Sequence, residues 1–402
     1  MNAAKPISIF LVAGEPSGDA LGGALIAALR RCAGGNLEIA GIGGERMQEE
    51  GLRSLVPLSE LAIAGIAEIL PRAPLILRRV RETVAAILRL RPDAVVTIDS
   101  SGFSWRIAQR LRRYGGNMPL IHYVAPMVWA WRGGRARRMA RWYDQLLALL
   151  PFEPPYFERV GLACDYVGHP VIESGADRGD GRRFRRSWGL AAEDLLLTVL
   201  PGSRESEVRR LLPIFGRALV LLERAIGRFR VVVPTVATVA ARVEQAVGAW
   251  PGQPIVVRRP QAKYDGFAAS RAALAASGTV ALELAMAGVP MVVGYRLNRL
   301  TEAFVARAVT VRQVNLVNLL LGRTLVPELL GRECTPERLA QALLPLIGDE
   351  RVRAAHRQGY DAAMRRLGAG ALSPSLRAAE RILAIIAARR RAVCDTLAEE
   401  PI

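Results

Sequence analysis

The sequence predicts an α/β protein made of two Rossmann-like, doubly wound domains that face each other across a cleft. First, 402 residues are too many for one compact core, so two domains are expected. Second, short apolar runs alternate with segments of helical periodicity in both halves of the chain. Third, both halves contain strands that end in a glycine-bearing turn before a helix, which is where parallel sheets place their ligands.

The domain boundaries follow from where this rhythm breaks. We expect a first domain over residues 1–172 and a second over 187–350. C-terminal helices over 351–402 are expected to pack back across the domains. A stretch rich in Gly, Asp and Arg, 173–186, interrupts every periodicity and predicts the interdomain linker. The expected strands are 7–13, 39–44, 94–98, 120–124 and 145–151, then 195–200, 230–234, 255–258, 272–276 and 290–295.

Composition narrows the class of protein. The net charge of +18 favours an acidic partner: nucleic acid, anionic lipid or a phosphorylated small molecule. No zinc-finger, recognition-helix or RNA-platform signature is present, which argues against nucleic acid. The four cysteines have no metal or disulfide spacing, which fits a reducing cytoplasm. We expect no cofactor. The apolar N-terminus is interpreted as a first strand, not a signal peptide, and no run reaches the roughly 18 apolar residues of a membrane span.

A polar loop follows the first predicted strand. It carries Glu15, Ser17, Gly18 and Asp19, and it lacks the G-x-G-x-x-G spacing of dinucleotide sites. Two acids in this loop favour sugar hydroxyls over phosphate as the ligand. The alternative is that Ser17 or Asp19 only caps the helix that follows.

Two further loops follow later strands of the first half. Asp99 comes directly after the buried run 94–98, so it is a candidate general base; capping of a helix over 105–114 is the alternative. Trp129 and Arg132 follow the run 120–124. They would contact an acyl chain, a sugar face or an anionic group, or else the tryptophan closes the domain core.

The segment 58–77 is unusually apolar beside several arginines. A helix over 74–90 directs one apolar face to the core, and further aliphatic residues are left over next to the arginines. An apolar patch ringed by arginine is typical of a membrane-surface docking element, while interior packing is the alternative. The predicted core residues are Leu77, Val80, Val84, Ile87 and Leu88, and the predicted patch is Ile66, Ile69, Leu70, Leu75 and Ile76.

The second half carries two glycine turns of its own. Ser203 and Arg204 follow the run 195–200, and the arginine suits a diphosphate. The turn 277–279 precedes a helix; Gly278 allows close approach of a ligand, and a phosphate is favoured there. Glu283, one turn later, can accept hydrogen bonds from a ribose diol. The alternative is that Ser277 and Thr279 only cap the helix and Glu283 is a solvated acid.

Two Rossmann-like domains without a dinucleotide fingerprint describe the GT-B glycosyltransferase architecture. Eight stretches, in order along almost the whole chain, carry a family resemblance: LVAGEPSGD (11–19), IHYVAPMVWAWR (121–132), LPFE (150–153), GHP (168–170), LPGSRESEV (200–208), ASGTVALE (276–283), PMVVGYR (290–296) and NLLLGR (318–323). With these stretches the chain closely resembles the lipid-A-disaccharide synthases of Gram-negative bacteria. The segment after Asp99, SSGF, and the tail past about Arg391 depart from the family pattern.

The resemblance implies an inverting, metal-free transfer of 2,3-diacylglucosamine from its UDP derivative to 2,3-diacylglucosamine 1-phosphate. The products are the β-1,6 disaccharide 1-phosphate of lipid A biosynthesis and UDP. Asp99 is our expected base and Glu15 the alternative. Arg204 and the amides of 277–279 would hold the diphosphate, Glu283 the ribose, and Asn318 would line the cleft.

The resemblance also implies a place for the enzyme on the cytoplasmic face of the inner membrane, and a homodimer is possible. The main rival function is that of a GT-B-fold UDP-sugar 2-epimerase, which needs acids and histidines around the sugar; the chain has three histidines, His122, His169 and His356. A non-enzymatic basic binding protein is the second rival, and it leaves the ligand loops of both halves unexplained.

Overall fold

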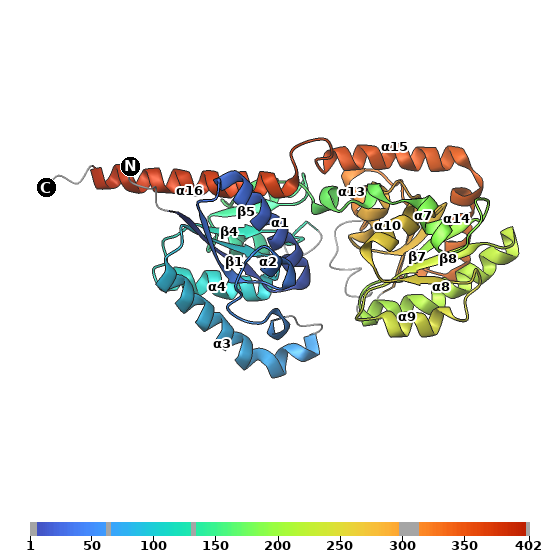
Figure 1. Cartoon of the computed structure of the whole chain (residues 1–402), viewed down its shortest axis with the longest axis horizontal. Helices are drawn as coiled ribbons and strands as arrows, with labels where there is room; N and C mark the ends of the chain where they lie inside the picture. The colour runs from blue at the N-terminus through green and yellow to red at the C-terminus, as the bar shows by residue number, and fades with distance from the viewer. Residues whose placement is uncertain (1–5, 62–65, 130–133, 297–312, 399–402) are drawn as a thin grey trace. The chain divides into compact units, whose positions relative to one another are not determined.

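The computed structural model describes residues 6–61, 66–129, 134–296 and 313–398. The chain divides into two compact units (Figure 1). Unit 1 comprises Met1–Pro170 and Gly370–Ile402, and unit 2 comprises Val171–Ala369. The C-terminal segment therefore returns to the unit in which the chain began.

Unit 1 is built on a six-stranded parallel sheet of order β2-β1-β3-β4-β5-β6. Its central strands are buried apolar runs, as expected for a parallel sheet covered on both faces. The strands are β1 Ile7–Ala13, β2 Leu37–Ile42, β3 Ala94–Ile98, β4 Leu120–Tyr123, β5 Gln145–Ala148 and β6 Ala163–Tyr166.

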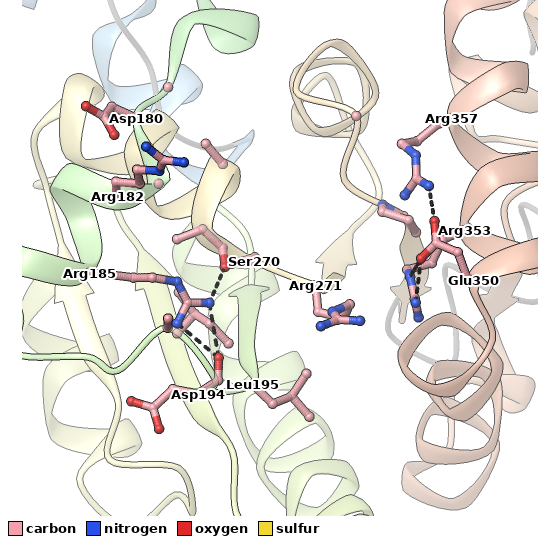
Figure 2. Close-up of a pocket in the computed structure, with 18 residues that line it drawn as sticks. Asp180, Arg182, Arg185, Asp194, Leu195, Ser270, Arg271, Glu350, Arg353 and Arg357 are labelled. Atoms are coloured by element: carbon pink, nitrogen blue, oxygen red, sulfur yellow. Dashed lines mark hydrogen bonds and ion pairs between the residues drawn. The ribbon is translucent and has the colours of Figure 1, made fainter.

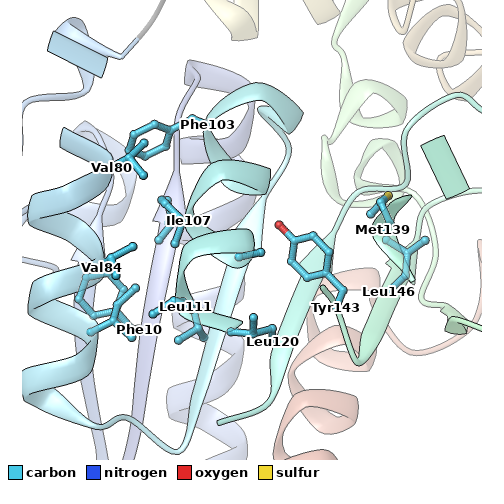
Figure 3. Packing of buried hydrophobic residues seen from close by; sticks show 14 of the residues in the cluster. Phe10, Val80, Val84, Phe103, Ile107, Leu111, Leu120, Met139, Tyr143 and Leu146 are labelled. Carbon is cyan, nitrogen blue, oxygen red and sulfur yellow. The ribbon is translucent and has the colours of Figure 1, made fainter. Parts of the chain in front are cut away.

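Helices cover both faces of this sheet. On one face Phe10 of β1 packs with Val84 of α3 and Ile107 of α4 (Figure 3). On the other face, Leu25 of α1 and Ile382 of α16 share a second apolar cluster. The helices are α1 Pro16–Ala33, α2 Glu45–Glu49, α3 Ile66–Leu90, α4 Ser101–Arg113, α5 Gly134–Met139, α6 Pro154–Glu158 and α16 Pro374–Ala398.

Unit 2 repeats this architecture with a parallel sheet of order β12-β11-β10-β7-β8-β9. Its core joins the strands to α8 and α14 through Phe215, Leu219 and Leu343, among others. The strands are β7 Leu196–Leu200, β8 Arg230–Pro234, β9 Ile255–Val257, β10 Ala272–Ala276, β11 Met291–Tyr295 and β12 Glu328–Leu330. The helices are α7 Gly181–Ser187, α8 Glu205–Ile226, α9 Ala240–Val247, α10 Pro260–Ala269, α11 Val280–Met286, α13 Leu316–Leu321, α14 Pro336–Gly348 and α15 Glu350–Arg366.

The predicted class, two doubly wound α/β domains, is confirmed, and strands 94–98, 230–234 and 272–276 have the expected bounds. Two short edge strands, β6 and β12, were not predicted, because a three- or four-residue edge strand carries little apolar pattern. The helix expected over 74–90 begins at Ile66, with Pro71 and Pro74 inside it. A proline inside a helix removes a backbone hydrogen bond, so the sequence analysis placed the start of this helix at Pro74.

The interdomain linker expected over 173–186 is instead folded into unit 2. Asp265 of α10 accepts hydrogen bonds from the backbone N–H of Asp180, at 2.8 Å, and from Arg183, at 2.7 Å. These contacts hold the start of α7 against α10. A polar, glycine-rich composition predicted a linker because the tertiary partner of Arg183 is 82 residues away in sequence.

Candidate active site

The polar loops after β1 and β3 meet at the carboxyl edge of the unit 1 sheet. The two strands are neighbours and end in register, with Ala13 paired to Ile98. The loops therefore start side by side, and the Ser17 hydroxyl lies 3.0 Å from Asp99 Oδ2, to which it donates a hydrogen bond. Two residues predicted for the same site, 82 positions apart, are thus in contact.

The backbone at Asp99 is strained. Asp99 and Ser100 have φ angles of 51° and 43°, in the left-handed region. Non-glycine residues seldom occupy this region, although aspartate tolerates it better than most. A β-carbon on Gly14 would lie 2.6 Å from Ser100 Oγ, so the close approach of the two loops requires glycine there.

This conformation removes Asp99 from the helix that follows it. The N-cap of α4 is Ser100, and no side chain caps this helix. The structural alternative for Asp99, capping, is therefore not realised. The carboxylate is half-buried and accepts a hydrogen bond from the Ser17 hydroxyl.

The other residues of the first loop have different surroundings. Asp19 is 5% exposed, and its carboxylate accepts hydrogen bonds from the backbone N–H groups of Gly44, Arg46 and Met47 at 2.7, 3.0 and 3.1 Å. It fixes the start of α2; this structural role differs from the predicted capping of the following helix, because Asp19 lies inside α1. Gly18 is buried, and Glu15 is exposed at the N-cap of α1 without capping it.

Trp129 is buried and packs edge-to-face on Phe152, with ring centroids 5.5 Å apart. This placement favours the core alternative over contact with an acyl chain. Arg132 lies outside the described residues.

Glu153 is a further acid at this edge of the sheet that sequence reasoning did not select as a site residue. It follows β5, is 3% exposed, and accepts a hydrogen bond from the backbone N–H of Leu150 at 3.0 Å. Burial raises the pKa of Glu153 to about 7, partly offset by that N–H. The available signal was an acid directly after a buried strand, in the LPFE stretch.

In unit 2 the loop after β7 is organised by a buried glutamate. The carboxylate of Glu207 accepts hydrogen bonds from the backbone N–H groups of Ser203 and Arg204, at 3.3 and 3.4 Å. Gly202 has φ 114°, and a β-carbon there would meet Glu207 at 2.8 Å. The guanidinium of Arg204 lies 3.2 Å from Glu207, while its side chain is 77% exposed and free to contact a ligand.

The loop after β10, the neighbouring strand of the same sheet, is open. Gly278 has φ 156°, and its β-carbon position has no atom within 4 Å. Thr279 is the N-cap of α11 but makes no side-chain cap bond, so the predicted capping by Thr279 is absent. Ser277 is half-buried, and Gly278 and Thr279 are exposed, which leaves this turn accessible to a ligand.

Glu283 is not a solvated acid. Its carboxylate lies 2.7 Å from Lys263 Nζ and 3.5 Å from the hydroxyl of Tyr264. Lys263 also lies over the ring of Tyr264, 4.6 Å from its centroid. Glu283 is therefore held in place by α10, with its charge balanced.

The prediction that Asn318 lines a cleft is wrong. It is 0% exposed, and its amide donates to Val326 O and Glu328 Oε1 and accepts from the N–H groups of Leu325 and Val326. With every hydrogen-bonding group engaged, it orders the turn before β12 and does not line a cleft. The residue lies in α13.

The predicted membrane patch is described only in part. Leu75 and Ile76 are half-buried, and Ile76 packs against the unit 1 core, as the interior alternative predicts for that residue. The side chains of Ile66, Ile69 and Leu70 lie outside the description. Of the expected core positions on this helix, Val80, Val84 and Ile87 are buried, and Leu77 and Leu88 are half-buried. No helix in the described part of the chain is long and apolar enough to cross a membrane.

Solved structures of known proteins share this architecture. UDP-GlcNAc 2-epimerase from Neisseria meningitidis, bound to UDP-GlcNAc, matches with a TM-score of 0.62 at 11% identity, over 94% of this chain and 98% of that one. MurG from Acinetobacter baumannii matches with a TM-score of 0.56 at 13% identity, over 95% and 99%. At such identities the likeness establishes the fold, and the protein is of the GT-B class.

Sequence comparison resolves the choice within that class. The family model described as Lipid-A-disaccharide synthetase matches residues 9–373. Lipid-A-disaccharide synthase of Rhodospirillum centenum is 55% identical, over 99% of this chain and 98% of that protein; the enzyme of Paramagnetospirillum magneticum is 52% identical, over 94% and 97%. The chain belongs to the lipid-A-disaccharide synthase family. It is a glycosyltransferase of lipid A biosynthesis.

Proposed function

We propose that the chain transfers 2,3-diacylglucosamine from UDP-2,3-diacylglucosamine to 2,3-diacylglucosamine 1-phosphate, with Asp99 as the base. Membership of the family gives the reaction, and the Asp99–Ser17 contact at the carboxyl edge of the unit 1 sheet supports the residue. Inverting transfer needs one group that removes the proton of the acceptor hydroxyl. A carboxylate without a cationic partner in the described structure suits that role, with exposed Glu15 as the alternative.

The donor site of the proposal is the pair of loops after β7 and β10. The exposed guanidinium of Arg204 would contact the diphosphate, and the open turn at Gly278 would let the phosphates approach backbone N–H groups. Glu283, held by Lys263, would accept hydrogen bonds from the ribose. No metal is required by this scheme, because the arginine balances charge on the leaving UDP.

The reaction is tested by incubating the full chain with the UDP-linked donor and the lipid acceptor. Disaccharide 1-phosphate and UDP should appear in equal amounts. Release of a 2-epimerised sugar without disaccharide would instead support the epimerase alternative.

We also propose peripheral binding to the inner-membrane surface through the start of α3. Arginines near an anionic leaflet add roughly 1 kcal/mol each, and Arg72, Arg78 and Arg81 belong to this segment. Leu75 and Ile76 offer a matched pair of variants, because among the described residues Ile76 packs on the unit 1 core and Leu75 does not.

Leu75→Ser should lower binding to phosphatidylglycerol vesicles and leave the Tm unchanged, whereas Ile76→Ser should lower the Tm by removing core contacts. Co-sedimentation measures the vesicle binding, and thermal melts measure the Tm. A Leu75→Ser variant that binds vesicles like the parent would contradict the docking role.

A further inference from the structure

Unit 2 contains a pocket of about 700 Å³ that the transferase scheme does not use. We call it the arginine pocket, because its walls carry Arg182, Arg185, Arg271, Arg353 and Arg357. In Figure 2, α7 and its neighbours form one wall, α15 forms the other, and Arg271 extends between them. Its volume is within the range of small-molecule sites.

The arginine pocket lies at the opposite edge of the sheet from the proposed donor loops. Its floor includes Leu196 and Arg271, at the amino-terminal starts of β7 and β10. The backbone N–H of Arg271 donates a hydrogen bond to Leu196 O at 2.8 Å. The donor loops follow the other ends of these same strands. Five residues of strand separate the two edges, a distance of roughly 16 Å. One ligand group cannot occupy both places.

The charges of the pocket are only partly balanced. Five arginines face three acids, Asp180, Asp194 and Glu350. Glu350 is engaged by Arg353, at 2.6 Å, and by Arg357. The carboxylates of Asp180 and Asp194 accept backbone N–H groups, from Arg183 and Ala191 respectively.

Three guanidinium groups therefore have no carboxylate partner among the described residues. Arg185 donates to the carbonyl oxygens of Ala191, Asp194 and Ala269, which orient it without neutralising it. The side chains of Arg182 and Arg271 are exposed and form no ion pair in the described part of the chain. Like charges held around one recess repel one another, and an anion between them removes that cost.

We propose that the arginine pocket binds a phosphorylated small anion, with Arg271 as its principal contact. Guanidinium groups recognise phosphate through paired, charge-assisted hydrogen bonds, and those of Arg182, Arg271 and Arg357 come from three separate elements around the same space. A soluble phosphate compound and the head group of a phosphorylated lipid share this chemistry. The site is additional to the transferase reaction, and its test rests on the proposed binding of UDP at the donor loops.

Calorimetric titration of pyrophosphate into the full chain, in the presence of saturating UDP, tests the proposal. UDP occupies the donor loops, so the remaining binding reports the arginine pocket. Arg271→Ala should weaken binding by about tenfold, the effect of losing one charge-assisted bond. The control is Arg217→Ala, an exposed arginine of α8 outside the pocket, which should leave the affinity unchanged.

Equal affinity in Arg271→Ala and the parent, or complete loss of pyrophosphate binding when UDP is added, would overturn the proposal. Thermal melts check folding, and Arg182→Ala replaces Arg271→Ala if the latter does not fold. Vesicles of phosphatidylcholine with and without phosphatidic acid then separate the two sources. Arg271-dependent sedimentation with phosphatidic acid assigns the site to a lipid head group; pyrophosphate binding without such sedimentation assigns it to a soluble anion.

Discussion

The carboxyl edges of the two sheets carry acids in contrasting surroundings. In unit 1, Asp99 bonds a hydroxyl and buried Glu153 bonds a backbone N–H, and neither has a cationic partner among the described residues. In unit 2, Glu207 is paired with Arg204 and Glu283 with Lys263. The carboxylates of Glu207 and Glu283 are fixed by their cationic partners, which suits a ligand acceptor, whereas those of unit 1 have no cation to hold them among the described residues. The same architecture thus provides a candidate base in one unit and fixed acceptors in the other.

The largest effect that this contrast predicts is that of Asp99→Asn. The variant keeps the shape and the left-handed backbone, which asparagine tolerates, but it cannot accept the proton. Turnover should fall by about 100-fold or more, while the circular dichroism melt is unchanged. Ser17→Ala, which removes only the hydrogen bond, should have a much smaller effect. Activity within about tenfold of the parent, a barrier change of ~1.4 kcal/mol, would exclude Asp99 as the base.

A second prediction concerns the pH dependence of stability at Glu153. Its pKa is raised to about 7 in the folded chain, above the ordinary value of 4.5, so the folded state binds more protons between these values. The contribution of neutral Glu153 to the free energy of unfolding is fully present below the ordinary pKa. It is lost as pH rises through about 7, which lowers the free energy of unfolding by about 3 kcal/mol.

Glu153→Gln cannot ionise and still accepts the N–H of Leu150. Its free energy of unfolding relative to the parent should therefore rise between pH 5 and pH 8, as measured by urea denaturation. Parallel curves for the two proteins over this range would show that Glu153 is not buried in its neutral form.

A third prediction concerns the paired acids of unit 2. Glu283→Ala should weaken UDP binding by about tenfold, because the ribose loses a charged acceptor, which is worth ~1.5 kcal/mol or more. Glu244→Ala is the matched control: it removes another ion-paired glutamate on the surface of unit 2, whose partner is Arg258. Fluorescence or calorimetric titration measures both. Equal losses in the two variants would remove Glu283 from the donor site.

The smallest predicted effect is that of chelation. Within the described ranges, no three His, Cys, Asp or Glu side chains converge as metal ligands. EDTA should leave the transfer rate unchanged, since arginine and backbone N–H groups are assigned to the diphosphate. Loss of activity that magnesium restores would show that the paired acids of unit 2 serve a metal.

The amino-acid sequence by itself determined the class of fold and where in the fold the candidate residues lie. Buried parallel strands such as Ala94–Ile98 are continuous apolar runs, and their ends are marked by glycine and polar residues, so both are visible locally. It therefore placed Asp99, Ser17, Arg204 and Gly278 at the ends of strands. The family stretches added the reaction.

Only the tertiary structure decided what each side chain does there. Asp99 and Asp19 both follow a strand in sequence, yet their surroundings differ. Asp99 accepts a hydrogen bond from a hydroxyl, whereas Asp19 accepts hydrogen bonds from three backbone N–H groups at the start of α2. Asn318 is likewise taken up by a turn, whereas Glu283 is oriented by a lysine on another helix. Whether a polar side chain can contact a ligand depends on how many of its hydrogen-bonding groups distant residues already occupy. Those distant groups are set by packing, which local sequence does not record.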